Sequence, residues 1–209
     1  MKIAVICANG RAGRYITNEA VSRGLDVTGF ARSANTTDAT KFVQTDLMDL
    51  TRESLEGFDV VIDAYGAWTP EGLAAHCTTQ AHLCDLLSGT NARLLVVGGA
   101  GSLFMDESHT TTLADTPDFP ESYKPVASAC AKALEELRKR DDVRWTYLCP
   151  AADFRPDGAR VGKYLLGGEE FKVNGKGESV ISYADYAVAM IDEAITGGHV
   201  RERISVVGE

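Results

Sequence analysis

Residues 2–13 read KIAVICANGRAG, a short apolar run that leads into a turn with two glycines. The run up to Cys7 has the length and aliphatic composition of a buried strand, and the residues from Arg11 onward have helical spacing. In such a turn, Gly10 would allow a phosphate to approach the backbone, and Gly13 would allow the helix to pack closely against the strand. The stretch therefore predicts a strand, a turn and a helix that together bind a dinucleotide.

One residue of this turn departs from the usual pattern. In a G-x-x-G-x-x-G turn the first position is glycine, whereas this chain has Cys7 there. A plain strand-to-helix turn with two glycines is therefore the alternative interpretation. If the turn binds a dinucleotide, its candidate cofactor-binding residues are Ala8, Asn9, Gly10, Arg11, Ala12 and Gly13.

The order of a strand followed by a helical segment recurs along the chain. The apolar runs are Lys2–Cys7, Asp26–Ala31, Lys41–Thr45, Asp59–Tyr65, Arg93–Val97 and Arg144–Cys149. The segments with helical spacing are Arg11–Arg23, Thr51–Gly57, Pro70–Leu87 and Lys124–Lys139. Nearly continuous apolar strands that alternate with helices are typical of a parallel sheet covered on both faces. We therefore predict an α/β fold, a Rossmann-type doubly wound parallel sheet with helices on both faces.

The pattern changes after Pro150. Glycine-rich, hairpin-like pieces occur at 166–168 and 174–177, and a helix is expected over Tyr183–Ile195. Ser182 and Asp185 form a capping box at its start, Gly197 and Gly198 end it, and a last strand is expected over Arg203–Val207. We expect one NAD(P)-binding domain over residues 1–209, in which residues 152–209 contribute a small lobe on the substrate side and the last strand.

Composition narrows the class of partner. The 209 residues carry 21 basic and 30 acidic side chains, a net charge of −9, and 44% are hydrophobic. This is enough apolar material for a core, and it excludes disordered and collagen-like chains. Without a cluster of lysines and arginines, binding to nucleic acid or to an anionic membrane is not expected. We expect a small-molecule substrate, and a monomer or a homodimer.

The cysteines and the apolar runs bear on the compartment. The five cysteines are scattered and include no C-x-x-C pair. No apolar run reaches the roughly 18 residues of a membrane span. The helical spacing of His76 and His82 directs them to different faces, so no metal site is expected. We expect a soluble, cytoplasmic chain without a metal.

The end of the second predicted strand bears on the choice of cofactor. Phe30 to Ser33 read FARS, with no acidic residue where the ribose hydroxyl of NAD is usually held. Arg32 can instead pair with the 2′-phosphate of NADP, with Ser33 beside it and Arg11 as a second positive charge. This favours NADP(H) over NAD(H). A solvated arginine at a strand end is the alternative.

Together these features resemble a known family, the atypical short-chain dehydrogenases, within it the NAD(P)H-binding group of NADH-flavin reductases, with a more distant likeness to biliverdin reductase B. The matching stretches are the N-terminal turn, LLVVGGAGSL at 94–103, Tyr123–Pro125, Pro150–Ala152 and ISYADYAVA at 181–189. The resemblance implies that Asp46 and Leu47 flank the adenine and that Pro150, Ala151 and Ala152 approach the nicotinamide. It also implies further cofactor contacts at Ala64, Tyr65, Gly66, Gly98 and Gly99.

The catalytic pair of ordinary short-chain dehydrogenases is missing. No tyrosine of this chain has a lysine four residues later, and residues 128–132 read SACAK. The candidate catalytic residues are therefore Ser102, Tyr123 and Lys132. The alternatives are that Lys132 is a solvated helix residue and that Ser128 only packs. Alcohol oxidation by the usual mechanism is not expected.

Reduction of a flavin has a weaker requirement, because the proton that accompanies the hydride can come from water. The expected function is hydride transfer from NADPH to a flavin, FMN or FAD, or to a similar planar acceptor. Tyr65, Trp68, Phe104 and Tyr123 could offer the acceptor an apolar face, or simply pack; His109 could touch it or lie on the surface. The alternative function is a non-catalytic redox sensor of the NmrA type that acts through a protein partner. A sugar-nucleotide epimerase is disfavoured, because it needs the missing tyrosine.

Overall fold

A computed structural model describes residues 1–209 and has an eight-stranded sheet at its centre, with strand order β3-β2-β1-β4-β5-β6-β10-β8. The strands are β1 (Lys2–Ile6), β2 (Asp26–Ala31), β3 (Lys41–Gln44), β4 (Val60–Asp63), β5 (Arg93–Val97), β6 (Arg144–Cys149), β8 (Tyr164–Gly167) and β10 (Glu202–Gly208). All neighbours are parallel except β10 and β8. The predicted Rossmann-type fold is confirmed.

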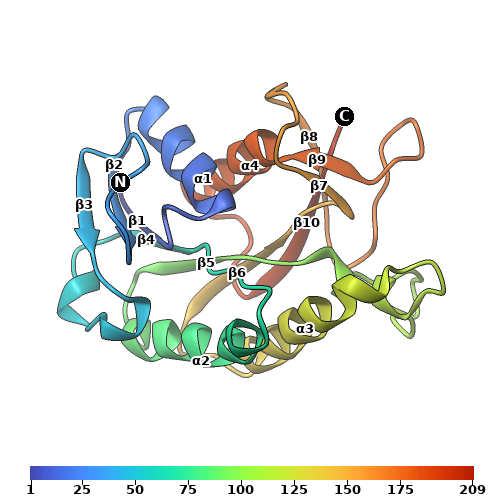
Figure 1. The fold of residues 1–209 in the computed structure, drawn as a ribbon, viewed down its shortest axis with the longest axis horizontal. Helices are drawn as coiled ribbons and strands as arrows, with labels where there is room; N and C mark the ends of the chain where they lie inside the picture. Colours follow the sequence, from blue (N-terminus) through green and yellow to red (C-terminus); the bar gives the residue numbers. More distant parts are fainter.

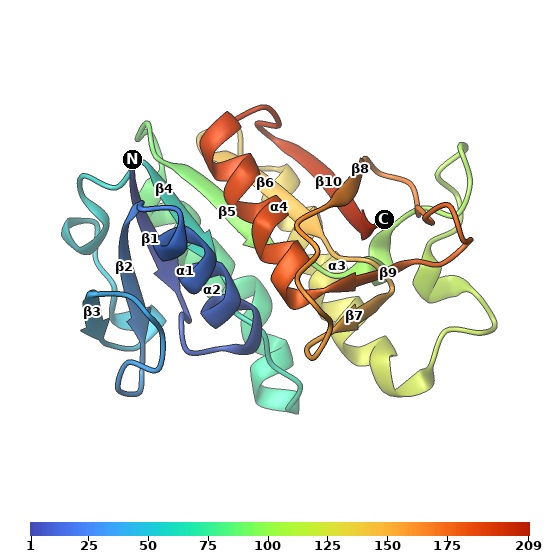
Figure 2. The same cartoon turned by 90° about the horizontal axis from the view of Figure 1, so that it is seen from above.

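Helices cover both faces of the sheet, as predicted. Helices α1 (Arg11–Ser22) and α4 (Tyr183–Thr196) lie side by side on one face, and α2 (Pro70–Leu87) and α3 (Lys124–Arg138) lie on the other (Figure 1, Figure 2). Alternate residues of β1 point to opposite faces of the sheet. Ile3 and Val5 pack in the core on the α1 and α4 side, whereas Ala4 and Ile6 pack in the core on the α2 and α3 side. Burial on both faces explains why the strands are continuous apolar runs.

One predicted helix is wrong. Over Thr51–Gly57 the chain makes only a single 3-10 turn, Glu53–Leu55. Seven residues are too few to repay the cost of starting an α-helix, and Gly57 is left-handed at φ 80°. Similar short turns occur at Leu47–Asp49, Ala100–Ser102, Leu113–Asp115 and Glu121–Tyr123.

The C-terminal region differs from expectation in its pairing. The piece at 166–168 forms no hairpin with its neighbours, because Leu166 lies in β8 opposite Val206 of β10. Strands β7 (Asp153–Arg155) and β9 (Val180–Ser182) form a separate two-stranded parallel sheet. The piece at 174–177 does turn back, since Asn174 N–H donates to the Glu178 carbonyl.

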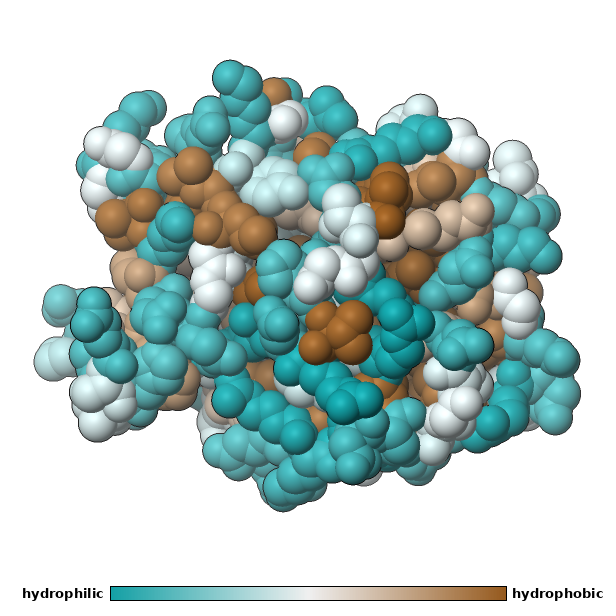
Figure 3. Space-filling model, turned by 180° about the vertical axis from the view of Figure 1, so that it is seen from behind, coloured by the Kyte–Doolittle hydropathy of each residue, from teal (hydrophilic) through white to brown (hydrophobic).

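The predicted ends of the last helix are confirmed, but the capping box is only half formed, because the Asp185 carboxylate accepts from the N–H groups of Val161 and Gly162 instead of that of Ser182. The Ser182 hydroxyl accepts a hydrogen bond of 2.9 Å from the Asp185 N–H, and Gly197 ends α4 in the left-handed conformation at φ 67°. No helix of the structure has the length and apolar composition of a membrane span. On the face seen in Figure 3, hydrophobic residues form small, separate patches among hydrophilic ones.

Candidate functional site

A cavity of about 860 Å³ lies at the carboxyl ends of β1, β2 and β4. These strands are neighbours in the sheet, so the cavity runs from the segments after β2 and β3, across the β1–α1 turn, to the loop between β4 and α2. Open parallel sheets bind ligands at this edge. The predicted cofactor-binding residues that line it are Asn9, Gly10, Arg32, Ser33, Asp46, Leu47, Ala64, Tyr65 and Gly66.

The β1–α1 turn is tight and packs closely against the start of α1. Cys7 adopts the left-handed conformation at φ 59°, in the place where the usual pattern has glycine, and its carbonyl accepts a 2.8 Å hydrogen bond from Gly10. A Cβ atom at Gly13 would lie 2.3 Å from that carbonyl oxygen, so only glycine allows α1 to pack this closely. No side chain caps the first N–H groups of α1, which leaves them open to an anion.

Asn9 fastens the loop after β2 to this turn. Its amide nitrogen donates to the Ser33 hydroxyl at 2.8 Å and to the Ala34 carbonyl at 2.7 Å. Its amide oxygen accepts from the Thr36 N–H and hydroxyl, both at 3.0 Å. The Asn9 side chain therefore sets the position of Arg32 and Ser33 rather than being free for a ligand.

Arg32 reaches over the cavity from the end of β2. Its side chain is 83% exposed, and its Nε lies 3.9 Å from an Asp46 carboxylate oxygen. Asp46 is itself held by the Met48 N–H, which donates to it at 2.9 Å. The Arg32 guanidinium is exposed, and its one acidic partner, Asp46, lies beyond hydrogen-bond distance. The guanidinium therefore remains available to a phosphate.

Two ionisable groups lie beside the cavity: Asp63 at the end of β4, and Cys7 directly after β1. Asp63 is 3% exposed, and the Tyr65 N–H donates to its carboxylate at 2.9 Å. Burial raises the pKa of Asp63 to about 6, against the opposing effect of that hydrogen bond. Burial, reinforced by the charge of Asp63, also raises the pKa of the Cys7 thiol to about 12. Cys7 is therefore a neutral thiol at physiological pH.

The remaining predicted cofactor residues do not line this cavity. Ala8 and Ala12 pack into the core, and Arg11 is exposed on the first turn of α1. A Cβ at Gly98 would lie 2.3 Å from the Tyr147 ring, so Gly98 makes room for that ring, and Gly99 faces Cys130. Pro150 and Ala151, which follow β6, are buried, whereas Ala152 is exposed.

The three candidate catalytic residues are not linked into a proton-transfer pair. Ser102 is buried, and its hydroxyl and carbonyl oxygens accept hydrogen bonds from Arg203. Lys132 is exposed on α3. Tyr123 is half exposed and packs edge-to-face on Trp68, with ring centroids 5.3 Å apart.

The candidate aromatic residues fall into two groups. The Tyr65 hydroxyl donates to the Gly72 carbonyl, and its ring packs against His76. Phe104 lies between the guanidinium of Arg203 and the His109 ring, which is stacked on it at 4.2 Å. Trp68 and Tyr123, by contrast, keep 59% and 50% of their surface exposed. His109 also pairs with Glu170 at 2.7 Å, on the surface.

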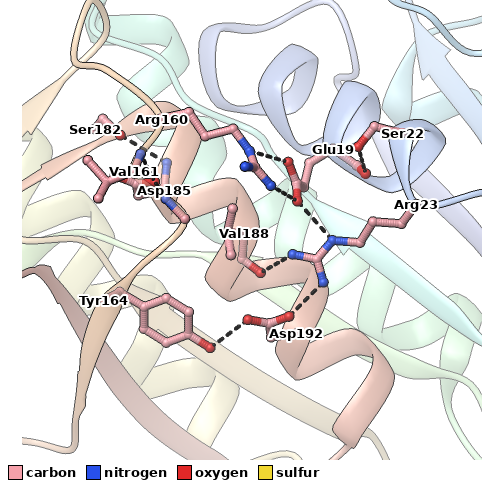
Figure 4. A network of polar contacts seen from close by, with 11 residues as sticks. Glu19, Ser22, Arg23, Arg160, Val161, Tyr164, Ser182, Asp185, Val188 and Asp192 are labelled. Atoms are coloured by element: carbon pink, nitrogen blue, oxygen red, sulfur yellow. Dashed lines mark hydrogen bonds and ion pairs between the residues drawn. The ribbon is translucent and has the colours of Figure 1, made fainter.

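Sequence reasoning missed a polar network that joins the C-terminal residues 160–192 to α1 (Figure 4). Glu19, on α1, is 7% exposed and binds Arg23 at 2.8 Å and Arg160 at 2.9 Å. Arg23 also forms an ion pair with Asp192 of α4 at 2.6 Å. Nearby, the Asp185 carboxylate accepts hydrogen bonds from the backbone N–H groups of Val161 and Gly162. The only local signal was a charged residue, Glu19, on the buried face of an amphipathic helix.

Comparisons with known proteins agree with this geometry. The NAD(P)H-binding family model matches residues 7–194. The protein YwnB of Bacillus subtilis (strain 168), described as uncharacterized, is 44% identical over 212 residues, covering 100% of this chain and 99% of YwnB. A crystal structure of "a putative NADH-flavin reductase" from Streptococcus pneumoniae is 51% identical with a TM-score of 0.98, covering 100% of both chains. That of a "putative epimerase" from Bacteroides thetaiotaomicron is 34% identical with a TM-score of 0.86, covering 99% of this chain and 96% of that one.

Proposed function

The chain belongs to the NAD(P)H-binding family, and we propose that it is an oxidoreductase that binds NADPH in this cavity and passes its hydride to a flavin. The observation that carries the proposal is the cavity itself, which joins the uncapped start of α1 to Arg32 on one side and to the loop after β4 on the other. The flavin is supported by the description of the Streptococcus pneumoniae relative as an NADH-flavin reductase and by the missing Tyr-x-x-x-Lys pair.

We assign the parts of the cofactor to residues as follows. The N–H groups of the turn from Gly10 to Gly13, with Arg11 beside them, would hold the pyrophosphate. Arg32 and Ser33 would hold the 2′-phosphate, and Asp46 and Leu47 would flank the adenine. The remaining proposed contacts, toward the nicotinamide, are Ala64, Tyr65, Gly66, Gly98, Gly99, Pro150, Ala151 and Ala152.

The chain's part in the reaction is alignment. When bound, the reduced nicotinamide supplies a hydride, which carries two electrons and one proton; a flavin gains its second proton from water. The buried Ser102 and the exposed Lys132 are therefore not required as acids, and neither is Tyr123, which packs against the cavity-lining Trp68. Holding donor and acceptor in register supplies most of the acceleration of such a transfer.

The test is the initial rate of NADPH oxidation with and without FMN, with NADH in parallel, on protein freed of copurified nucleotide. We expect saturable, FMN-dependent turnover that prefers NADPH. If both nucleotides bind and neither is consumed, the reductase proposal fails and the redox-sensor alternative takes its place, because a sensor needs binding without turnover.

A further inference from the structure

We propose that Trp68 and Tyr123 together form the surface on which the planar ring of the acceptor stacks. This inference rests on the proposed function, since it names where the flavin of that reaction binds. The two residues are 55 positions apart in the sequence and are brought together only by the fold, with their rings at 84° to each other.

The location follows from the order of the strands. Arg32 marks the adenosine side of the cavity at the end of β2, and the sheet continues from β2 through β1 to β4 and β5. A dinucleotide whose pyrophosphate meets the start of α1 extends away from Arg32, toward the ends of β4 and β5. Trp68 lies in the loop after β4 and lines the cavity, and Tyr123 lies in the segment between β5 and α3.

Both rings are held at the starts of well-packed helices. Trp68 comes directly before Thr69, which caps α2 through a hydrogen bond from the Gly72 N–H, and Pro70 is the first residue of that helix. Tyr123 is the residue before α3, and Pro125 follows in its first turn. Proline at a helix start fixes its own backbone angle and suits the first turn, so the two helix starts that follow the rings are well defined.

The exposure of this pair is unusual among the aromatic residues of the chain. The other tryptophan, Trp145, is only 4% exposed, whereas Trp68 is 59% and Tyr123 50% exposed. Trp68 lines the cavity, and Tyr123 extends the aromatic surface from it through their edge-to-face contact. Tyr65 and Phe104 cannot serve in the same way, because their rings already pack against His76 and His109. A flat heteroaromatic ring would cover the open surface and remove it from water.

The experiment uses FMN as the probe and three full-length variants. Trp68→Leu keeps an apolar side chain but removes the aromatic face, and Trp68→Phe restores an aromatic face. Val161→Ala is the control, because Val161 is apolar and 65% exposed but lies outside the cavity. Each protein is saturated with NADP⁺, and the quenching of FMN fluorescence is titrated. The KM for FMN, kcat and the Kd for NADPH are measured separately.

We expect Trp68→Leu to weaken FMN binding and raise its KM about five- to tenfold, the worth of one aromatic stacking contact. The rise should exceed any change in the NADPH Kd; Trp68→Phe should recover most of the loss, and Val161→Ala should match the wild type. An unchanged FMN titration and KM in Trp68→Leu would overturn the inference even if the enzyme turns over. Quenching by wild type but not by Trp68→Leu, without turnover in either, would support the binding surface and refute the reductase.

Discussion

Arg32 is the residue that we propose to favour NADPH over NADH. Replacing it with aspartate puts a second carboxylate near Asp46, at the place proposed for the 2′-phosphate. Hydrogen bonds to charged groups contribute about 1.5–3 kcal/mol, so the NADPH Kd of Arg32→Asp should rise about 10- to 100-fold. The NADH Kd should change little, because NADH has no 2′-phosphate.

Nucleotide fluorescence titrations measure both constants. Arg52→Asp is a matched control, since it makes the same change of charge at an exposed arginine that does not line the cavity. If Arg32→Asp binds NADPH as tightly as the wild type does, the assignment of the 2′-phosphate site is wrong.

Asp63 should make stability depend on pH in an unusual direction. Burial raises its folded-state pKa to about 6 from 3.8, so the folded protein holds a proton that the unfolded chain has released. Stability from this group is therefore full below pH 3.8 and is lost as the pH rises toward 6 and above. Asp63→Asn keeps an acceptor for the Tyr65 N–H but cannot ionise.

The free energy of unfolding is measured by urea denaturation from pH 4 to pH 7. The wild type should lose about 2–3 kcal/mol relative to Asp63→Asn across this range. Asp118→Asn, at an exposed loop carboxylate, should follow the wild-type curve. Parallel curves for the wild type and Asp63→Asn would show that Asp63 does not titrate in this way.

At the scale of elements, the contact between α1 and the segment that contains Arg160 depends on Glu19. Burial alone would raise the pKa of Glu19, but hydrogen bonds from Arg160 and Arg23 outweigh it and lower that pKa. The carboxylate therefore stabilises the fold at neutral pH, and this contribution is lost as the pH falls below 4.5 through the lowered pKa.

Glu19→Gln leaves two arginines without their shared carboxylate. We expect it to destabilise the protein by about 2–3 kcal/mol at pH 7, below the full cost of a buried pair because Arg160 is half exposed. Thermal unfolding measures this as a fall in Tm of about 4–12 °C, and amide exchange over residues 156–163 should accelerate. Glu136→Gln, which removes an exposed pair with Lys139, should change stability by less than about 1 kcal/mol. Equal effects of the two variants would contradict a special role for Glu19.

Some helices and strands can be predicted from their local sequence alone. The bounds of β2, β5, β6 and α2 agree with the predicted ranges, because their apolar spacing and end signals are local. The segment Thr51–Gly57 failed as a helix because its spacing is helical over too few residues. β8 was not predicted as a partner of β10, since nothing in residues 164–167 specifies a pairing with residues 205–208.

At the scale of the whole molecule, the cavity joins segments at the ends of four strands, so a bound cofactor should stabilise the entire fold. A ligand that binds only the folded state at 100 times its Kd contributes about 2.7 kcal/mol. NADPH at that ratio should raise Tm by about 5–10 °C. Differential scanning calorimetry tests this, with Arg32→Asp at the same NADPH concentration as the control, for which the rise should be smaller. No shift in the wild type would exclude tight binding to the folded state.

The sequence by itself determined the alternation of strands and helices, the turn from Cys7 to Gly13, the basic end of β2 and the absence of a catalytic tyrosine and lysine pair. These are properties of residues that are neighbours along the chain, where apolar period, glycine and charge have direct structural meaning. The candidate residues that line the cavity follow strand ends, and a parallel sheet brings its strand ends to one edge.

Only the tertiary structure decided what each side chain of the site is free to do. Ser102 and Arg203 are 101 residues apart and bind each other, which removes Ser102 from solvent. The Asn9 side chain is hydrogen-bonded to Ser33 in the loop after β2. Of the four candidate aromatic residues, only Trp68 and Tyr123 keep at least half of their surface exposed. These outcomes depend on which distant segments the packed core places in contact. A buried polar group takes whatever partner lies there, because leaving it unpaired costs more than the bond contributes.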